Sequence, residues 1–547
     1  MTAKLREAAA VALLAGCVAV VMTWPLAYKI NRLGRTDNGD GNFSIWNVAW
    51  VARTLVVDPL HVFDANIFYP HTKTLAYSEN NLGAGALAIP VYWATRNPFA
   101  AHNFVVLLAF VLTATGTYYL VRRLVDDRGA AAVSAICFAF TPYMFAHTAH
   151  IQLLMTAGLP FSMLAFHRFA DRVSPARGAA LGVVMAAQAI CCGYYGVFVI
   201  LMVGYASIVV AVTRRQWGSS RYWLGLGVGA VVAIALVTPA FLPYVTLQRV
   251  QGFHRALDEA RLYSSNWSDY FASSSYAHVW MLAYLPRWIE VAFPGFVAAL
   301  LGLAGPWVAR PGGDVRGDVR RAELVAIYGG LAFLAFWASF GPAGFLYAAL
   351  YRAVPLFAWL RVPARFGLLV SFGLSVLAGA TLAQMLRACT RPALVASAVA
   401  LVAAAELVVP SNMREVNGFE PVYRTLATLP RAPVIELPFY YIEGMFPLHT
   451  RYMLSSTTHW MPLVNGYSDY IPPDFVANVM TLAPFPSRPA LKLLEPLKVR
   501  YAVFHMYGYN ESNRQDVLTR LKELEPYFRP LYMGEDTRLY EIVGFPP

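Results

Sequence analysis

The sequence predicts a polytopic α-helical membrane protein that carries a small α/β domain at its C-terminal end. The chain of 547 residues is 58% hydrophobic with a mean hydropathy of +0.48, and a soluble protein of this length could not bury so much apolar side chain. Apolar runs long enough to cross a bilayer recur from residue 8 to residue 410. After residue 410 they give way to short patterns typical of buried strands and surface helices.

About eleven apolar runs are expected to span the membrane: 8–28, 101–121, 130–146, 151–169, 178–193, 196–213, 222–245, 291–309, 322–340, 365–386 and 393–410. One further run, 83–96, contains Pro90, and its segment from Gly83 to Ala94 would extend only about 18 Å as a helix. We therefore expect 83–96 to be re-entrant or interfacial, although a crossing is not excluded by the sequence.

The positive residues set the expected orientation. Arginines gather in alternate connections, which marks those connections as cytoplasmic: Arg122, Arg123 and Arg128; Arg172 and Arg177; Arg214, Arg215 and Arg221; Arg310 to Arg321; Arg387 and Arg391. The N-terminus is then cytoplasmic, the part after residue 410 is extracytoplasmic, and the chain resides in a bacterial cytoplasmic membrane. The net charge of +12 follows from this topology, and no basic face interleaved with aromatic residues indicates nucleic-acid binding.

Two domains are expected. The first, 1–410, is the transmembrane domain with an outer loop at 29–100, and the second, 411–547, is the α/β domain. Buried strands are predicted at 432–439 and 499–505, a helix at 513–525 and a final hairpin at 529–543.

Several kinds of chemistry find no support in the sequence. All five cysteines lie in or beside apolar runs, which argues against a disulfide framework or a zinc site: Cys17, Cys137, Cys191, Cys192 and Cys389. Phosphate-binding loops, dinucleotide fingerprints, His-Glu-x-x-His and Gly-x-Ser-x-Gly motifs do not occur either. No cofactor is firmly indicated.

The first outer loop opens with two carboxylates, Asp37 and Asp40, in the stretch from Thr36 to Trp46. Gly39 and Gly41 flank Asp40 and are expected to allow a tight turn. We interpret Asp40 as a catalytic base at the membrane surface. The alternative is that both carboxylates belong to a solvated turn or a helix cap before Asn42. An amphipathic helix lying along the interface is predicted to follow from Asn42.

Other candidate residues lie in later outer segments. Arg361 and Arg365 are suited to bind a lipid phosphate, or else they anchor a helix end at the headgroups. His147, His150 and Gln152 are suited to bind a donor phosphate or a sugar hydroxyl, and the alternative is plain hydrogen bonding within a turn. Together with Glu79, the two histidines offer an option for a divalent metal ion. We expect Asp40 and these residues to converge on one cavity.

Several motifs resemble the bacterial membrane glycosyltransferases of the GT-C fold. They are Thr23-Trp24-Pro25-Leu26, Gly39-Asp40, Asp64 to His71, Leu75 to Glu79, Phe138 to Tyr143, His147 with His150-Ile151-Gln152, Leu360 to Phe366 and Asn465 to Ser468. The resemblance implies a polyprenyl-phosphate-sugar donor and an inverting transfer on the outer face, with Asp40 as base. By the same resemblance, Asp37 and Tyr77 join the donor- or acceptor-binding residues.

The expected function is therefore transfer of one sugar from a polyprenyl-phosphate carrier to a glycan, lipid or protein acceptor of the cell envelope. Membrane lipids are the other expected partners, and nucleic acid is not. Two alternatives stay open: a transporter or flippase of lipid or polysaccharide, and a non-catalytic envelope-assembly protein that keeps the same scaffold. The first alternative requires ionisable residues within the spans, where Glu406 is the main one.

Overall fold

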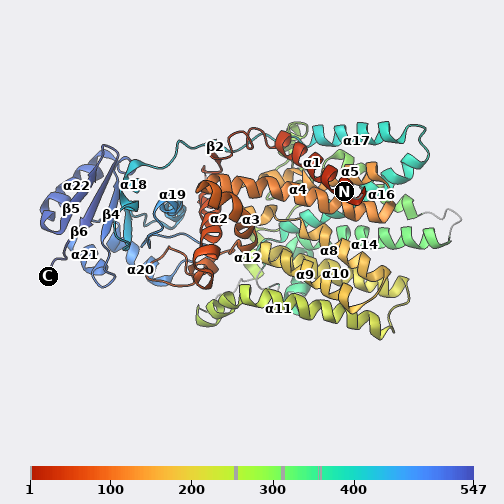
Figure 1. The fold of residues 1–547 in the computed structure, drawn as a ribbon, viewed down its shortest axis with the longest axis horizontal. Coiled ribbons are helices and arrows are strands. Elements are labelled where there is room, and N and C mark those ends of the chain that lie inside the picture. The colour runs from red at the N-terminus through yellow and green to blue at the C-terminus, as the bar shows by residue number, and fades with distance from the viewer. Residues whose placement is uncertain (1–2, 38, 252–256, 310–314, 355–356, 358–359) are drawn as a thin grey trace. The chain divides into compact units, whose positions relative to one another are not determined.

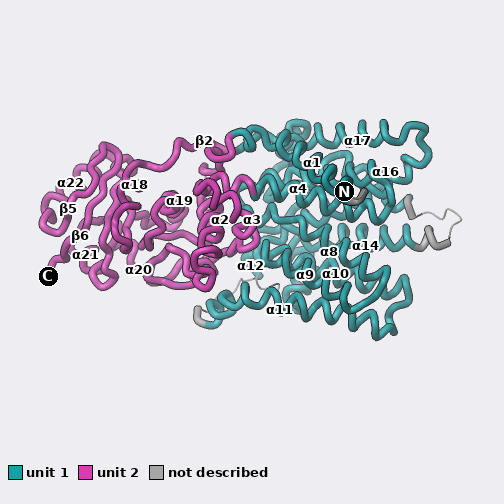
Figure 2. The backbone as a smooth tube through the Cα atoms, viewed as in Figure 1, with its two compact units in different colours: residues 1–28, 105–412 teal, residues 29–104, 413–547 magenta. Residues whose placement is uncertain are grey.

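The computed structural model describes residues 3–37, 39–251, 257–309, 315–354, 357 and 360–547. The chain forms two compact units, which Figure 2 distinguishes by colour. Unit 1 consists of Met1–Tyr28 and Val105–Asn412, and unit 2 consists of Lys29–Phe104 and Met413–Pro547. Arg310, which belongs to one of the expected cytoplasmic clusters, lies outside the described residues.

Unit 1 is built from helices (Figure 1). In chain order they are α1 (Ala3–Met22), the main part of α4 (Pro98–Val125), α5 (Arg128–Ala139), α6 (Pro142–Ala146), α7 (Ile151–Leu154), α8 (Gly158–Asp171), α9 (Pro175–Cys191), α10 (Gly193–Thr213), α11 (Ser220–Gln251), α12 (Leu257–Leu262), α13 (Phe296–Leu303), α14 (Val315–Ser339), α15 (Leu346–Ala353), α16 (Gly367–Arg387) and α17 (Pro392–Glu406).

The described part of the chain contains 8 helical segments that are long and apolar enough to cross a membrane: Leu5–Met22, Pro98–Val125, Arg128–Ala146, Ile151–Asp171, Gly193–Thr213, Ser220–Arg249, Arg320–Ser339 and Pro363–Arg387. Each coincides with a predicted span. The three remaining predicted spans contain shorter apolar helices, Pro175–Cys191, Phe296–Trp307 and Pro392–Glu406. The prediction of a multi-pass helical membrane protein is confirmed, and every predicted span is helical.

Burial differs sharply between the spans of unit 1. In the segment Pro363–Arg387, 94% of the residues of its apolar 18-residue stretch are buried, and its helix α16 packs against α5, α13 and α14. In Leu5–Met22 and Ser220–Arg249, only 17% of the residues of the corresponding stretch are buried. Because these two exposed helices are apolar, their free faces suit hydrocarbon and not water. Unit 1 therefore has a central helix and peripheral helices that are suited to contact lipid.

Helices α9 and α11 approach each other through paired glycines. A Cβ atom at Gly178 would lie 1.9 Å from the carbonyl oxygen of Gly225, and one at Gly182 would lie 2.1 Å from that of Gly229. Within each helix the two glycines are four residues apart, which places both of them on one helix face. Larger side chains at these positions would force the two helices apart.

Unit 2 contains a four-stranded sheet with strand order β3-β4-β6-β5. Its elements are β1 (Leu33–Gly34), α2 (Gly39–Val57), α3 (Leu82–Thr95), β2 (Arg414–Glu415), α18 (Pro421–Ala427), β3 (Val434–Leu437), α19 (Thr450–Ser455), α20 (Pro473–Leu482), α21 (Arg488–Leu494), β4 (Tyr501–His505), α22 (Glu511–Glu523), β5 (Phe528–Met533) and β6 (Thr537–Ile542). Strands β3 and β4 are parallel and fully buried, whereas β5 and β6 form an antiparallel hairpin. The predicted strands, helix and hairpin are confirmed.

The first outer segment folds together with the C-terminal part. Strand β1 pairs with β2, and the backbone N–H groups of Phe68 and Tyr69 donate to the carbonyl oxygens of Asn465 and Leu463. The sequence instead assigns the loop 29–100 to the transmembrane domain, because hydrogen bonds between segments so distant in the chain leave no local pattern. The segment 83–96, for its part, forms the 14-residue helix α3, which packs against α2.

Helix α2 differs from the prediction of an amphipathic interfacial helix. Most of its residues are buried, on all sides: Gly41, Asn42, Ser44, Ile45, Trp46, Asn47, Val48, Ala49, Trp50, Val51, Ala52 and Thr54. The indole N–H groups of Trp46 and Trp50 donate to Asn66 Oδ1 (3.1 Å) and to the carbonyl oxygen of Val62 (2.8 Å). The helix is correctly predicted and its amphipathic character is not, because α3 and α19 cover it. Its tryptophans are buried anchors of unit 2.

Candidate functional site

The nine predicted site residues divide between the two units. Four belong to unit 2: Asp37, Asp40, Tyr77 and Glu79. Five belong to unit 1: His147, His150, Gln152, Arg361 and Arg365. Their convergence on one cavity stays a prediction.

Asp40 lies in the first turn of α2, and its residue is exposed. The predicted tight turn is absent, because the helix already begins at Gly39. The neighbouring glycines serve close packing: a Cβ atom at Gly41 would lie 1.8 Å from the carbonyl oxygen of Arg35, and one at Gly39 would lie 2.6 Å from Cβ of Pro447. A carboxylate in this position is stabilised by the N-terminal end of the helix dipole. Asp40 thus lies at the start of a closely packed helix.

Asp37 forms a fork-shaped ion pair with Arg35. Arg35 donates from Nε to Asp37 Oδ1 at 3.0 Å and from Nη2 to Oδ2 at 3.3 Å. Hydrogen bonding from Arg35 lowers the pKa of Asp37. With its carboxylate already committed to Arg35, Asp37 is less suited than Asp40 to take a proton from a substrate.

Tyr77 and Glu79 lie in the segment before α3. Tyr77 is buried, and its ring meets that of Tyr470 edge to face at 5.1 Å. Burial raises the pKa of Tyr77 to about 12, so it remains a neutral phenol. Glu79 is half-buried, and its backbone carbonyl accepts a hydrogen bond from Asn47 Nδ2 at 3.1 Å. The motif around these residues therefore stabilises the fold of unit 2 as well as presenting polar groups.

In unit 1, His147 is held between two acceptors. Its Nδ1 lies 2.8 Å from the carbonyl oxygen of Tyr143, and its Nε2 lies 3.3 Å from Glu290 Oε2. A carbonyl oxygen only accepts, so Nδ1 donates to Tyr143, and Nε2 faces the Glu290 carboxylate. The imidazole is thus held in one orientation between two oxygen atoms.

Arg365 is the second basic residue of this group. Its guanidinium lies over the ring of Tyr194 at 4.9 Å from the ring centroid. The hydroxyl of Tyr194 in turn donates to the carbonyl oxygen of Val362, next to the short helix Pro363–Phe366 that carries Arg365. Packing against Tyr194 fixes the position of the arginine without neutralising its charge.

Glu290 lies near both basic side chains. It is 7% exposed, and its Oε1 accepts a hydrogen bond from the backbone N–H of Val291 at 2.9 Å. Burial acts to raise the pKa of Glu290, but His147, the Val291 N–H and Arg365 together outweigh it and lower the pKa. We refer to His147, Glu290 and Arg365 as the outer cluster, in which one buried carboxylate lies near two basic side chains.

The sequence analysis names His147 and Arg365 but misses Glu290. The only signal in the sequence is a carboxylate placed directly before the apolar run 291–309. Such a residue is easily taken for an ordinary headgroup contact, because nothing local shows that it is buried against His147.

Three other candidates belong to unit 1: Arg361, His150 and Gln152. Arg361 approaches Glu259 at 3.7 Å, and its guanidinium lies 5.2 Å from the ring centroid of Tyr263. His150 precedes α7, with its ring centroid 6.2 Å from that of His147. Gln152 lies within α7 and is half-buried. The structure thus brings His147, His150 and Arg365 toward one region and pairs Arg361 with a separate acid.

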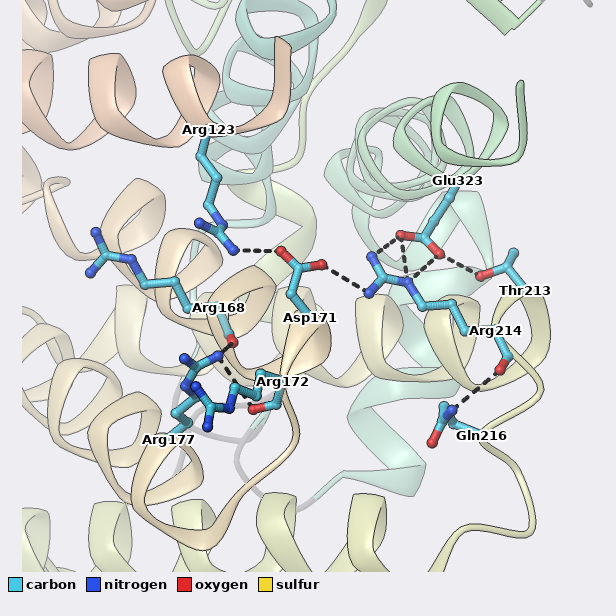
Figure 3. A network of polar contacts seen from close by, with 9 residues as sticks. All are labelled: Arg123, Arg168, Asp171, Arg172, Arg177, Thr213, Arg214, Gln216 and Glu323. Atoms are coloured by element: carbon cyan, nitrogen blue, oxygen red, sulfur yellow. Dashed lines mark hydrogen bonds and ion pairs between the residues drawn. The ribbon is translucent and has the colours of Figure 1, made fainter. Parts of the chain in front are cut away.

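A second polar cluster joins four long helices of unit 1 (Figure 3). Arg123 of α4 pairs with Asp171 of α8, which also accepts from Nη1 of Arg214 at 3.0 Å. Arg214, directly after α10, donates to Glu323 of α14 at 2.6 and 2.9 Å. Figure 3 shows Asp171 between the two arginines, and Thr213 donates to the far side of Glu323 at 2.7 Å. Every charge in this chain of contacts has an opposite partner.

No group of three or more His, Cys, Asp or Glu side chains suited to a metal ion occurs in the part of the chain that the structure describes. The option of a divalent ion between Glu79 and the two histidines joins residues of different units and stays a prediction.

Comparisons with known proteins identify the fold. A family model described as "Dolichyl-phosphate-mannose-protein mannosyltransferase" matches residues 94–241. No curated protein matches the sequence. Two cryo-EM structures of the arabinofuranosyltransferase AftD from Mycobacteria, the second of a mutant, match 98% of this chain with TM-scores of 0.54 and 0.56 at 14% and 15% identity.

The chain spans only 40% and 41% of the length of the two AftD chains. A crystal structure of ArnT from Cupriavidus metallidurans matches 99% of this chain and 98% of its own at 13% identity, with a TM-score of 0.41. That score is too low to establish a common fold, so the fold assignment depends on AftD. On this evidence the chain is a multi-pass membrane protein with the GT-C fold of membrane glycosyltransferases.

Proposed function

We propose that this protein is an inverting glycosyltransferase that moves a sugar from a polyprenyl-phosphate donor to a cell-envelope acceptor. The observation that carries the proposal is the outer cluster, in which two basic side chains, His147 and Arg365, lie near one buried carboxylate. A site of this kind on the GT-C fold is suited to a phosphate ester. The family match over 94–241, with its lipid-phosphate mannose donor, supports the same donor class for this chain.

In the proposed reaction, the outer cluster binds the phosphate that leaves with the polyprenyl chain. Arg365 offers a planar guanidinium to the phosphate oxygens, and the His147 imidazole is proposed to contact them as well. Charge on the leaving phosphate grows as the bond to the sugar breaks, so fixed positive groups stabilise the transition state more than the bound donor. Arg361 and His150 are proposed to contact the donor as well.

The acceptor hydroxyl needs a base on the opposite side of the sugar carbon. We assign that role to Asp40, because an inverting transfer needs one carboxylate that accepts the hydroxyl proton as the oxygen attacks. Its exposed position in the first turn of α2 leaves it accessible to an acceptor. Tyr77, Glu79 and Gln152 are proposed to bind donor or acceptor hydroxyls, with Asp37 in a supporting role, and a divalent ion remains an optional part of the proposal.

The proposed location is the cytoplasmic membrane, with the N-terminus inside and the α/β part of unit 2 outside. The distribution of arginines in the sequence supports this orientation. Acceptors of the proposed class, such as a glycan, lipid or protein of the envelope, are found on that side of the membrane.

The test uses the full chain in membranes that supply the natural acceptor, with labelled polyprenyl-phosphate sugars as donors. Asp40→Asn should abolish sugar transfer while the protein stays folded and still binds donor. Asp58→Asn is the matched control, because Asp58 is an exposed carboxylate directly after the same helix. Full transfer by Asp40→Asn would exclude this base. Donor binding without transfer by the wild type would favour the assembly protein, and vectorial movement of intact lipid would favour the flippase.

A further inference from the structure

A pocket in unit 1 has a volume of about 720 Å³, and its lining includes none of the three residues of the outer cluster. Its lining comes from the segments 261–267 and 287–289, from the C-terminal end of α14 and from the helical turn Gly341–Gly344. The volume falls within the range of sites that hold small ligands. Nothing in the proposed transfer reaction uses this pocket.

One wall of the pocket is aromatic and pre-arranged. The ring of Trp267 packs against those of Phe336 and Phe340 at centroid distances of 5.2 and 5.4 Å. Trp337 donates from its indole N–H to the carbonyl oxygen of Gly344 at 2.6 Å, which fixes its ring at the edge of the pocket. These contacts hold the wall in shape without a ligand.

Three aromatic side chains of the same wall are exposed on the surface of the protein. Trp267 is 67% exposed, Phe333 is 63% exposed and Trp337 is 40% exposed. Rings this large and this exposed suit hydrocarbon contact, and tryptophans are favoured at the depth of the lipid headgroups. The pocket lies at the end of α14 that the arginine pattern predicts to be extracytoplasmic.

Two arginines line the polar part of the pocket. Arg287 is exposed, and among the residues described its side chain has neither a hydrogen bond nor an acidic partner. Arg261 pairs at 3.0 Å with Asp258 of its own helix α12, where both side chains are largely exposed to solvent. Exposed pairs of this kind are weak, so Arg261 is available to a stronger anion.

We propose that this pocket binds an anionic glycerophospholipid of the outer leaflet. Arg261 and Arg287 contact the phosphate of the headgroup, and one acyl chain lies against Trp267, Phe333 and Trp337. The combination of two exposed arginines, one of them only weakly paired, with an exposed aromatic wall is complementary to an amphiphile with an anionic head, and matches neither a free phosphate nor a neutral lipid. The pocket is a lipid site separate from the one proposed for the donor.

The experiment measures the melting temperature of the detergent-purified full chain against added phosphatidylglycerol or phosphatidylcholine. Phosphatidylglycerol should stabilise the wild type in a saturable manner, and phosphatidylcholine should do so much less. Arg261→Gln combined with Arg287→Gln should weaken the apparent affinity about a hundredfold, at about tenfold for each lost charged contact. Arg352→Gln is the matched control, because Arg352 is an exposed arginine on α15 that does not line the pocket, and it should behave like the wild type.

Phe333→Ala tests the apolar half and should weaken binding of a long-chain phosphatidylglycerol more than that of a short-chain one. Equal stabilisation of the wild type by both lipids, or full stabilisation of the double arginine variant, would overturn the proposal. Undecaprenyl phosphate is the third probe. If its stabilising effect depends on Arg261 and Arg287 while that of phosphatidylglycerol does not, the pocket belongs to the donor and the proposal is wrong. The outcome is independent of sugar transfer, which the Asp40 experiment measures.

Discussion

The two charged clusters of unit 1 are built from the same kinds of side chain and differ in their charge balance. Among the residues of Figure 3, two arginines, Arg123 and Arg214, are paired with two acids, Asp171 and Glu323, and these four side chains form a neutral cluster. The outer cluster places two basic side chains, His147 and Arg365, near one acid, Glu290. The neutral cluster pairs each of its charges within the helices that it connects, whereas the outer cluster has more basic groups than acids and is therefore suited to accept an anion.

This comparison separates structural from functional charge in a way that residue type alone does not. Both clusters contain arginines near helix ends, and the sequence distinguishes them only by the side of the membrane on which each is predicted to lie. The number of acidic partners within reach decides between the two roles. Four predictions follow the comparison, in order of decreasing expected effect.

Removing a cation from the outer cluster should have the largest effect. Arg365→Gln should lower kcat/KM for donor-dependent transfer by about 100-fold or more, since a fixed charge that stabilises the leaving phosphate is lost. The melting temperature should change little. Arg387→Gln, at the other end of α16 and exposed, should keep wild-type activity. If the Arg365→Gln variant were fully active, the outer cluster would have only a structural role, like the neutral cluster.

Breaking the neutral cluster should affect stability instead. Glu323→Gln removes the carboxylate that Arg214 and Thr213 both contact, and we expect a loss of about 2 kcal/mol in the free energy of unfolding. Thermal unfolding in detergent measures the effect. Transfer per folded molecule should match the wild type, and a selective loss of transfer would show that this cluster also serves the reaction.

A third cluster, in unit 2, has the opposite composition, because two acids surround one histidine. His505 lies 2.8 Å from Glu436 and 3.3 Å from Glu420. Burial acts to lower the pKa of His505, but the hydrogen bonds and charges of both glutamates outweigh it and raise the pKa to about 9. The stabilisation is then complete below pH 6.5, the ordinary value for histidine, and is lost as the pH rises through about 9.

The melting temperature of the full chain, measured from pH 6 to pH 10, should therefore fall across the upper part of that range. His505→Gln should be less stable at pH 6 and should show a flatter dependence on pH. A wild-type profile that is identical to that of the variant would show that His505 does not carry the charge.

The smallest effect is expected at Asp37. Its ion pair with Arg35 balances one positive charge with one negative charge, as the neutral cluster does with two of each. Asp37→Asn should cost about 0.5 kcal/mol at neutral pH, as is typical of partly exposed ion pairs. Because the pKa of Asp37 is lowered, this contribution is present at neutral pH and disappears as the solution becomes acidic. Transfer should persist in the variant, in contrast to Asp40→Asn. Complete loss of transfer would place Asp37, and not Asp40, at the reaction centre.

Much of the fold is predictable because it depends on local patterns. A run of some twenty apolar residues has few stable conformations in a membrane other than a helix, so each predicted span is found as a helix. The strands at 434–437 and 501–505 are equally visible, since buried parallel strands are short and continuously apolar.

The site is less predictable because its partners come from distant segments. His147 and Arg365 attract attention as ionisable residues beside spans, but Glu290 acquires its importance only from burial next to His147. In the same way, the glycines beside Asp40 suggest a turn, whereas the structure uses Gly41 to admit the carbonyl oxygen of Arg35.

The sequence by itself determined that this chain lies in a membrane, where its helices run and which residue types are available for phosphate chemistry. Composition and periodicity carry that information, because hydrocarbon admits only backbone that satisfies its own hydrogen bonds. The tertiary structure alone decided that 29–104 folds with 413–547, that α2 is buried, and that Glu290 joins His147 and Arg365. Contacts between segments that are far from adjacent in the chain decide these features, and no local pattern records them.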